Sequence, residues 1–314
     1  MTVYHSLPVL DSSSAAVALT LGMFDGVHRG HQAILARLRE AAAALHGNAL
    51  VLTYAQHPAQ VVRPESSPLL ICTLEERLRL FEQAGVAATV ILPFDDAFSK
   101  MNAAAFIQTV LLDTLRAQAI VVGHDCRFGH QREGGAALLQ SWAARAGFAF
   151  FDVPALRIHG DPVSSTAVRQ AIQDGDLEKA ALLLGRPWTI SAGVLPGHHI
   201  GRTLGFPTAN LDTSGIVLPA AGVYACRVAL ADTWYNGTMY VGTKPTFPGH
   251  TAEVRCEVYL IGFSGDLYDR RLTVRPLQRL RNDQRFATPE ALRQQITLDV
   301  AAARQLLEKR HAAD

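Results

Sequence analysis

The first half of the chain alternates short apolar runs with longer stretches of helical periodicity. The apolar runs have the length and β-branched content of buried strands, and they span residues 15–21, 48–53, 88–92, 119–122 and 148–153. After the first run, apolar residues recur at the spacing of one helix face: Ile34, Leu35, Leu38 and Ala42. Further helices are predicted over residues 74–83, 103–117 and 136–146. Such alternation predicts βαβ units and a parallel sheet.

A change in the sequence pattern near residue 186, from alternating strands and helices to closely spaced strands, predicts a domain boundary. Residues 164–166 (Ser-Ser-Thr) are typical of a helix start, and we expect that helix to run to about residue 184. Gly185 followed by Pro187 is a helix stop. The predicted domains are therefore residues 1–186 and 187–314.

The second domain consists of closely spaced strand-like segments with glycine and proline turns, which predicts a small antiparallel β-barrel. The segments span residues 189–194, 222–230, 238–242, 252–260 and 272–280. Thr288 and Pro289 then begin a final helix. Its apolar face comprises Leu292, Ile296, Val300 and Leu306 or Leu307.

Composition narrows the class of protein. The 314 residues are 49% hydrophobic, enough for two cores, and the net charge is +1 without a basic block, which argues against nucleic acid and anionic membranes as partners. The four cysteines are far apart and contain no C-x-x-C pair, which favours reduced thiols. No signal peptide or membrane-length apolar run is evident. A cytoplasmic location is therefore expected.

The most specific candidate site is the turn over residues 22–32, GMFDGVHRGHQ, between the first strand and the first helix. Gly22, Gly26 and Gly30 allow sharp turns and close approach of a ligand, and the helix N-terminus attracts an anion. His28 and His31, three residues apart in the first turn, would face that anion. An ordinary strand-to-helix turn is the alternative. Binding of a metal ion by the two histidines is another alternative, although the H-E-x-x-H pattern is absent.

Two further segments follow predicted strands, at the edge where open α/β sheets bind ligands. Residues 53–58 include His57, and residues 123–129 include Asp125 and Arg127. The alternative for Asp125 and Arg127 is a structural ion pair.

A third segment, residues 163–169, opens the helix at the end of the first domain. Ser164, Ser165 and Thr166 offer hydroxyl and amide groups, and Arg169 lies one turn later. Simple helix capping is the alternative for the hydroxyls.

In the second domain, residues 193–210 form a glycine-rich loop followed by two oxygen ligands suited to Mg²⁺, Thr208 and Asn210. The loop positions of interest are Gly193, Gly197, Gly201, Arg202, Gly205 and Pro207. It is not a Walker loop, because no Gly-Lys-Ser/Thr follows. An ordinary barrel loop is the alternative.

Alternation along residues 252–260 predicts that Cys256, Val258 and Leu260 share the inner face of a strand and Glu257 the outer face. Glu253 shares this second face with Glu257, and one of the two carboxylates is expected to face a site. The alternative is a solvated glutamate on the outside of the barrel.

Taken together, the N-terminal motifs resemble one family. The string G-x-F-D-G-x-H-x-G-H contains the H-x-G-H motif of nucleotidyltransferases, and with residues 53–58, 123–129 and 163–169 it is similar to the FAD synthetase module of bacterial bifunctional riboflavin kinase/FAD synthetases. This resemblance implies a Rossmann-like sheet on which the FMN phosphate attacks the α-phosphorus of MgATP, giving FAD and pyrophosphate.

The resemblance also implies roles for individual residues. His28 and His31 would stabilise the ATP phosphates, and Ser165, Thr166 and Arg169 would hold the phosphate tail. Asp125 and Arg127 would line the flavin or nucleotide pocket. The remaining nucleotide-site residues would be Gly22, Phe24, Asp25, Gly26, Gly30, His57 and Ser164.

The second domain resembles the riboflavin kinases. Residues 201–210, G-R-x-L-G-F-P-T-A-N, match their ATP-binding motif, which implies that Thr208 and Asn210 hold Mg²⁺. By family position, Glu257 would take the proton from the ribityl 5′-hydroxyl of riboflavin as it attacks the γ-phosphate. Arg281 and Phe286 match a late R-x-x-x-x-F segment near the flavin ring.

The chain departs from the family at Gln56, usually proline, and at Cys126, usually phenylalanine, which we interpret as a packing residue. Ala167 and Val168 replace a larger pair before the arginine. Tyr240 replaces an asparagine, and Asp269 stands where glycine is usual; aspartate tolerates positive φ well.

These departures leave two alternatives to a bifunctional enzyme: a chain in which only the adenylyltransferase works, and a flavin-binding regulator without catalysis. The sequence makes no prediction of oligomeric state. It contains no carrier arm, so FMN is expected to leave one site through solvent before it reaches the other.

Overall fold

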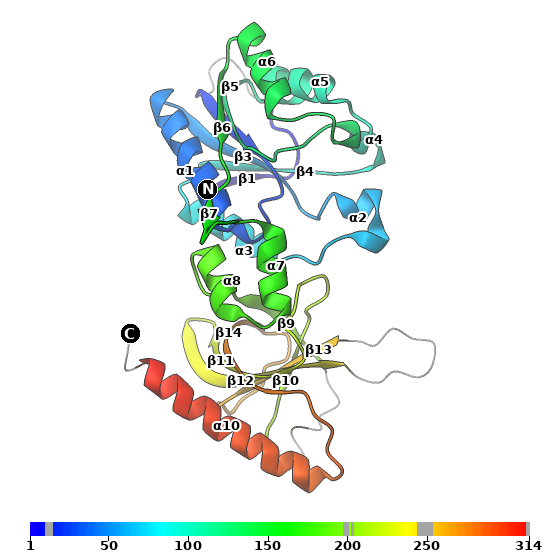
Figure 1. Cartoon of the computed structure of the whole chain (residues 1–314), viewed down its shortest axis with the longest axis vertical. Helices are drawn as coiled ribbons and strands as arrows, with labels where there is room; N and C mark the ends of the chain where they lie inside the picture. Colours follow the sequence, from blue (N-terminus) through cyan, green and yellow to red (C-terminus); the bar gives the residue numbers. More distant parts are fainter. Residues whose placement is uncertain (10–14, 197–200, 202–203, 244–253, 312–314) are drawn as a thin grey trace. The chain divides into compact units, whose positions relative to one another are not determined.

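The computed structural model describes residues 1–9, 15–196, 201, 204–243 and 254–311. It divides into two compact units, Met1–Ser165 and Thr166–Asp314, which are drawn in Figure 1. Gly197 and Arg202, which the sequence assigns to the phosphate loop, lie outside the described residues. The predicted boundary after residue 186 stays a prediction.

A six-stranded sheet forms the centre of the first unit, with the strand order β1-β4-β3-β2-β5-β6 and parallel pairing throughout. The strands are β1 (Thr2–Tyr4), β2 (Val17–Leu21), β3 (Asn48–Tyr54), β4 (Ala88–Leu92), β5 (Ala117–Gly123) and β6 (Ala149–Val153). The predicted parallel sheet is confirmed. A small hairpin, β7 (Arg157–Ile158) and β8 (Asp161–Pro162), follows the sheet.

Helices cover both faces of this sheet. On one face α1 (Arg29–Ala44) and α3 (Leu74–Gln83) pack on β2, β3 and β5 through Leu35, Leu38 and Phe81. On the other face, α6 (Ala136–Ala146) and a π-helix, Phe106–Thr114, bury residues such as Leu139 and Ile107. The short helices are α2 (Ala59–Val62), α4 (Asp96–Ser99), α5 (Ala103–Ala105) and the 3₁₀ turns Asp25–Val27, Pro64–Ser66 and His130–Arg132.

The α-helix predicted over residues 103–117 is only partly correct. Its first three residues are α-helical, and the next nine adopt the wider π form, in which the Leu115 amide donates to the Val110 carbonyl at 3.0 Å. The helix ends at Thr114, because Arg116 takes a left-handed conformation (φ +49) and β5 begins at Ala117.

The single helix predicted over residues 165–184 is wrong, since the structure has two helices: α7 (Ser165–Gln173) and α8 (Leu177–Leu184). Gly175 takes φ +77, which an α-helix cannot contain, and the Asp176 carboxylate accepts from the Lys179 amide at 3.0 Å to begin α8. The predicted stop is confirmed, because Gly185 ends α8 with φ +72.

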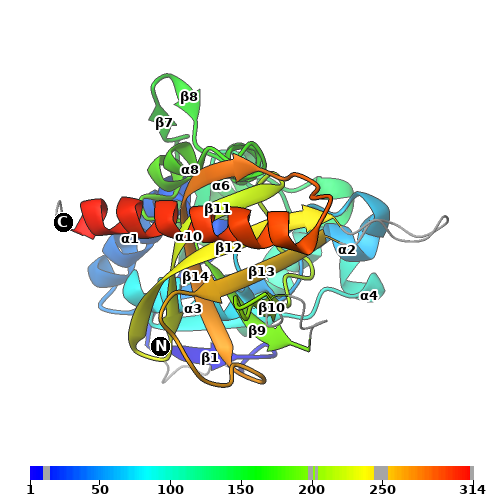
Figure 2. The ribbon, with the colours of Figure 1, turned by 90° about the horizontal axis from the view of Figure 1, so that it is seen from below.

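Six antiparallel strands of the second unit close into a barrel in the order β10-β13-β12-β11-β14-β9, as Figure 2 shows. They are β9 (Ile190–Leu195), β10 (Ala209–Leu211), β11 (Gly222–Leu230), β12 (Thr233–Thr243), β13 (Val254–Leu260) and β14 (Arg271–Asn282). The predicted barrel is confirmed. Its interior is apolar, with residues such as Met239, Val258 and Val274 fully buried.

One long helix, α10 (Pro289–His311), packs on the outside of the barrel (Figure 2). It begins as predicted, with the Thr288 hydroxyl accepting from the Ala291 amide at 3.2 Å. Ala303 and Leu307 pack against Ala225 of β11. Among the helices of the described residues, none is long and apolar enough to cross a membrane.

Candidate active sites

The first candidate site lies where the order of the strands reverses. The chain runs from β2 outward through β3 and β4 and then returns to β5 on the other side of β2. Ligands of open α/β sheets bind at this switch point, beyond the carboxyl ends of the strands. Gly22 directly follows β2, and Gly123 ends β5. The sheet therefore places two of the predicted motifs at its ligand-binding edge.

The turn after β2 has an unusual backbone, in which Phe24, Gly26 and Val27 all have positive φ angles of +52, +75 and +41. Glycine is required at residue 26 for two reasons. Besides its left-handed φ, an added Cβ would lie 2.8 Å from Cγ2 of Ile71. This conformation turns the chain from the sheet into α1.

The Asp25 carboxylate fixes this turn from inside. It is 2% exposed and accepts hydrogen bonds from the backbone amides of Ile71, at 2.9 and 3.1 Å, and Cys72, at 3.4 Å. The contacts join the turn to the segment before α3. Asp25 thus has a clear anchoring role within the fold, and the ligand contact implied for it by resemblance stays a prediction.

The two histidines stack on each other at the start of α1. Their ring centroids are 3.6 Å apart and the ring planes are inclined by 17°. The prediction that both histidines lie in the first helical turn is wrong for His28, which caps the helix: α1 begins at Arg29, and Nδ1 of His28 accepts from the His31 amide at 3.3 Å. Gly30 permits this arrangement, because a Cβ there would lie 3.2 Å from the His28 ring.

His31 lies in an environment that disfavours a proton. Burial, then the neighbouring His28 and Arg77, lower the pKa of His31 well below 6.5. Its Nδ1 is buried and has no hydrogen-bond partner within the described part of the chain. The site therefore holds an uncharged imidazole at neutral pH, close to a helix N-terminus.

Arg77 of α3 is a site residue that the sequence analysis missed. Its guanidinium is buried, 1% exposed, and donates to the carbonyls of Met23 at 2.8 Å and Tyr54 at 2.5 Å. Met23 lies two residues after β2, and Tyr54 is the last residue of β3. Arg77 therefore joins two of the predicted motifs and supplies positive charge beneath the turn.

We expect replacement of Arg77 by methionine to lower the free energy of unfolding of the first unit by about 2–4 kcal/mol, because buried carbonyls would lose their donor. The matched control is Arg79→Gln on the same helix. Arg79 is half-exposed and pairs with Glu76 at 2.7 Å, an interaction worth about 0–1 kcal/mol. Urea unfolding measures both. Equal losses for the two variants would contradict the anchoring role of Arg77.

The third predicted motif contacts the first. The Ser165 hydroxyl donates to the Asp25 carbonyl at 3.0 Å, although the two residues are 140 positions apart. Ser164 precedes it, and Ser165 is the first residue of α7. Thr166 and Arg169 follow in the second unit, where Thr166 is exposed and Arg169 is one turn beyond Ser165.

The remaining nucleotide-site candidates of the first unit follow β3 and β5. His57 accepts at Nδ1 from the amide of Ala59, the first residue of α2, at 3.1 Å. Asp125 and Arg127 are exposed, and Arg127 donates to the Cys126 carbonyl at 2.8 Å. No ion pair joins Asp125 to Arg127 in the described structure; Oδ1 of Asp125 lies 3.9 Å from Nδ1 of His124 instead. Burial raises the pKa of Cys126 to about 12, which fits its interpretation as a packing residue.

The second candidate site is on the outer face of the barrel, around Glu257. The predicted alternation is confirmed for residues 256–260, since Cys256, Val258 and Leu260 are buried and Glu257 is half-exposed. In the strand register Glu257 lies opposite Asn210 of β10 on one side and opposite Tyr240 of β12 on the other. Residues directly opposite share one face of the sheet.

Thr208 joins this row, because its hydroxyl donates to Oε2 of Glu257 at 3.0 Å. Oxygen atoms from Thr208, Asn210 and Glu257 thus gather on one face, and such donors suit a hard divalent cation. In the described part of the chain, no group of three His, Cys, Asp or Glu residues forms a metal site.

The glycine-rich loop before Thr208 folds back on itself. The Phe206 amide donates to the Gly201 carbonyl at 2.8 Å, and a Cβ on Gly201 would lie 2.4 Å from the Phe206 carbonyl oxygen. Gly205 needs its left-handed φ of +88, whereas Gly193 lies within β9 in open space. Pro207 is exposed between this turn and β10.

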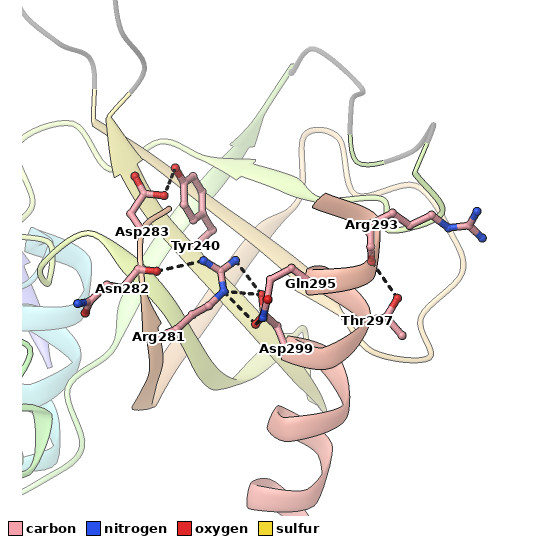
Figure 3. A network of polar contacts seen from close by, with 8 residues as sticks. All are labelled: Tyr240, Arg281, Asn282, Asp283, Arg293, Gln295, Thr297 and Asp299. Carbon is pink, nitrogen blue, oxygen red and sulfur yellow. Dashed lines mark hydrogen bonds and ion pairs between the residues drawn. The ribbon is translucent and has the colours of Figure 1, made fainter. Parts of the chain in front are cut away.

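Arg281 is held by α10. Its guanidinium makes an ion pair with Asp299 through three contacts of 2.9 to 3.0 Å, and Asp299 also accepts from Gln295 (Figure 3). The Arg281 guanidinium also lies over the Phe286 ring, with Cζ 5.6 Å from the ring centroid. The sequence analysis missed Asp299, a buried acid on an otherwise apolar helix face. Asp269 has φ +58, as expected for a residue that stands where glycine is usual.

Comparison with known proteins covers both units. The FAD synthetase family matches residues 10–167, and the riboflavin kinase family matches residues 184–307. Two bifunctional riboflavin kinase/FMN adenylyltransferases are similar over most of their length: that of Pseudomonas fluorescens at 41% identity, covering 98% of both chains, and that of Escherichia coli K12 at 38%, covering 91% of both.

A solved structure is similar throughout as well. The crystal structure of a protein described as a macrolide-efflux protein from Streptococcus pneumoniae superposes with a TM-score of 0.82 at 31% identity, covering 95% of this chain and 98% of that one. Both family matches and both enzyme relatives agree with the two units and their motifs. The chain belongs to the family of bifunctional riboflavin kinase/FMN adenylyltransferases.

Proposed function

We propose that the two reactions of this family take place at the two separate sites described above. The chain is a riboflavin kinase and FMN adenylyltransferase, which makes FMN from riboflavin and FAD from FMN, with ATP consumed in each step. Phosphorylation is assigned to the outer face of the barrel around Glu257. Adenylyl transfer is assigned to the turn that carries His28 and His31.

For the kinase step, Glu257 is the general base. It takes the proton of the ribityl 5′-hydroxyl, whose oxygen forms a bond to the γ-phosphorus of ATP as the bond to ADP breaks. The observation that carries this assignment is the Thr208 hydrogen bond to Oε2 at 3.0 Å. That bond fixes the carboxylate in orientation and leaves Oε1 for the substrate hydroxyl.

The same face suits a divalent cation, as ATP-dependent activities require, and we propose Mg²⁺ with Thr208 and Asn210 as its ligands. When bound with ATP, the ion neutralises charge on the phosphates. Thr208 has two roles in this arrangement: it orients Glu257 through its proton and offers its oxygen to the cation.

For adenylyl transfer, the phosphate of FMN is already an anion and needs no protein nucleophile. Its oxygen forms a bond to the α-phosphorus of ATP while the bond to pyrophosphate breaks, so the protein aligns the groups and stabilises negative charge. The N-terminus of α1 and the stacked imidazoles of His28 and His31 supply donors for this purpose. We assign the ATP phosphates to these groups, and contacts with the flavin or the nucleotide to Asp125 and Arg127.

All four cysteines are free thiols, and we place the protein in the cytoplasm, where they would stay reduced. The substrates are small molecules, namely riboflavin, FMN and ATP.

Incubation of the purified protein with riboflavin and MgATP tests the proposal. We expect FMN to rise first and FAD to follow after a lag, because FMN passes through solvent. A parallel reaction that starts from FMN tests adenylyl transfer alone. FAD from FMN but no product from riboflavin would leave only the adenylyltransferase. No product from either would indicate a flavin-binding protein without catalysis.

A further inference from the structure

Tyr240, a departure from the family motif by the resemblance described above, lies beside the proposed kinase base. It stands directly opposite Glu257 in the pairing of β12 with β13. Its neighbours Met239 and Val241 are buried in the barrel, so Tyr240 is on the outer face and is half-buried there. The aromatic ring therefore forms one side of the surface around the Glu257 carboxylate.

The two sides of Glu257 differ in chemistry. On the β10 side are Thr208 and Asn210, whose small polar groups suit a metal-bound triphosphate. On the β12 side is the Tyr240 ring, and Phe286 is the half-buried aromatic residue of the segment after β14. Flat aromatic surfaces suit a planar heterocycle. Riboflavin is accordingly expected on the Tyr240 side.

The hydroxyl of Tyr240 is anchored. It donates to Oδ1 of Asp283 at 3.2 Å, as Figure 3 shows. The ring extends along its own strand over Gly242, where an added Cβ would lie only 2.0 Å from the tyrosine oxygen. Gly242 thus gives the ring its place, and Asp283 fixes the hydroxyl at its tip.

Asp283 is the first residue after β14, at the start of the segment that leads to α10 at Pro289. The two residues before it are also fixed. Arg281 binds Asp299 of α10 and lies over Phe286, and it donates to the Asn282 carbonyl at 3.0 Å. The hydrogen bond from Tyr240 is therefore a second attachment for this segment, made from the opposite side to α10.

The charges around Tyr240 keep its hydroxyl a donor. Burial, then the carboxylate of Asp283 and more weakly that of Glu257, raise the pKa of Tyr240 to about 12, while Arg281 acts in the opposite direction. The phenol is therefore protonated at neutral pH. Because it donates to Asp283, the Glu257 carboxylate keeps its oxygens for Thr208 and the substrate.

We propose that Tyr240 is a positioning residue for riboflavin: through its bond to Asp283 it holds residues 283–288, with Phe286, against the face of Glu257. The inference rests on the proposed placement of the kinase site around Glu257. It predicts that the Tyr240 hydroxyl contributes to riboflavin binding and not to phosphoryl transfer.

Tyr240→Phe in the full-length protein tests this inference. We expect the KM for riboflavin to rise about five- to tenfold, the effect of losing one typical hydrogen bond, and kcat to stay within about twofold. The KM for ATP and the rate of FMN adenylylation should not change. The matched control is Tyr235→Phe on the same strand, whose ring packs on Phe263 at 5.4 Å. It should leave the riboflavin KM unaltered.

A double-mutant cycle with Asp283→Ala identifies the partner. If the hydroxyl acts through Asp283, the double variant has the same riboflavin KM as either single variant. Additive effects, an unchanged KM in Tyr240→Phe, or a loss in kcat alone would each overturn the inference.

Riboflavin binding to Glu257→Gln, followed by flavin fluorescence, separates this inference from the proposed function. In that background Tyr240→Phe should still weaken riboflavin binding about five- to tenfold. Normal kinase turnover in Glu257→Gln would refute the role of Glu257 as the base. The effect of Tyr240→Phe on riboflavin affinity would still decide the positioning role of Tyr240. Equal riboflavin affinity with and without Tyr240→Phe would overturn the positioning role of Tyr240, irrespective of the kinase activity of Glu257→Gln.

Discussion

Replacement of Glu257 by glutamine is expected to lower the kcat of FMN formation by at least about 10²-fold, since loss of a general base costs about 10²–10⁴-fold. Glutamine has nearly the same shape, and its amide oxygen can still accept from the Thr208 hydroxyl, which donates to Glu257 at 3.0 Å. It cannot take a proton. The loss should therefore appear in kcat, with riboflavin binding largely retained.

The same protein provides an internal control, because conversion of FMN to FAD should proceed at the normal rate in Glu257→Gln. Glu290→Gln, at the exposed start of α10, is the matched variant and should leave both reactions unchanged. If Glu257→Gln lost both activities together, the assignment of two separate sites would be wrong. Undiminished FMN formation would show that another group removes the proton.

Replacement of His31 by alanine is expected to slow FAD formation about 10²–10³-fold, the usual cost of losing one donor to developing charge. His31 stacks on His28 at 3.6 Å at the start of α1, and its low pKa makes it a neutral imidazole in the unliganded enzyme. It therefore acts as an N–H donor without adding a full charge. Phosphorylation of riboflavin should not change.

His5→Ala is a suitable control for His31→Ala, because His5 is an exposed histidine of the same unit. Steady-state rates with FMN and MgATP measure the effect, and circular dichroism checks the fold. A His31→Ala protein that makes FAD at the normal rate would refute the role of that imidazole in phosphate stabilisation.

Much of the architecture follows from patterns that are local in sequence. The central strands of the sheet are continuous apolar runs bounded by turns, so β3 and β4 lie at or within a residue of their predicted bounds. β1 and β10 escaped prediction because three residues are too few to show a period. The break between α7 and α8 was also missed, since the left-handed Gly175 was weighed less than the apolar periodicity around it.

The candidate sites divide in the same way. Motifs such as His28 to His31 and Thr208 to Asn210 combine chemistry with short spacing, so sequence alone is enough to predict them as site residues. Arg77 was not recognised, although it lies three and four residues before the buried Leu80 and Phe81 and hence on the same helix face. The signal that could have identified Arg77 is a positively charged residue on an otherwise apolar helix face. Its carbonyl partners, Met23 after β2 and Tyr54 at the end of β3, emerge only from the fold.

The Tyr240 contact depends on tertiary structure still more. Tyr240 and Asp283 are 43 residues apart, and nothing in either local sequence indicates that they meet. The same holds for Arg281 and Asp299, where a strand residue and a helix residue are joined by an ion pair. Such long-range polar pairs are where sequence patterns give least information.

The central claim is that one chain runs two reactions at two sites with FMN free between them. Complementation tests it most directly: Glu257→Gln and His31→Ala proteins are each incubated with riboflavin and MgATP, separately and as a mixture. We predict that neither variant alone makes FAD at an appreciable rate, and that the mixture does so after FMN has accumulated. A mixture that makes no more FAD than the two variants separately would contradict the claim.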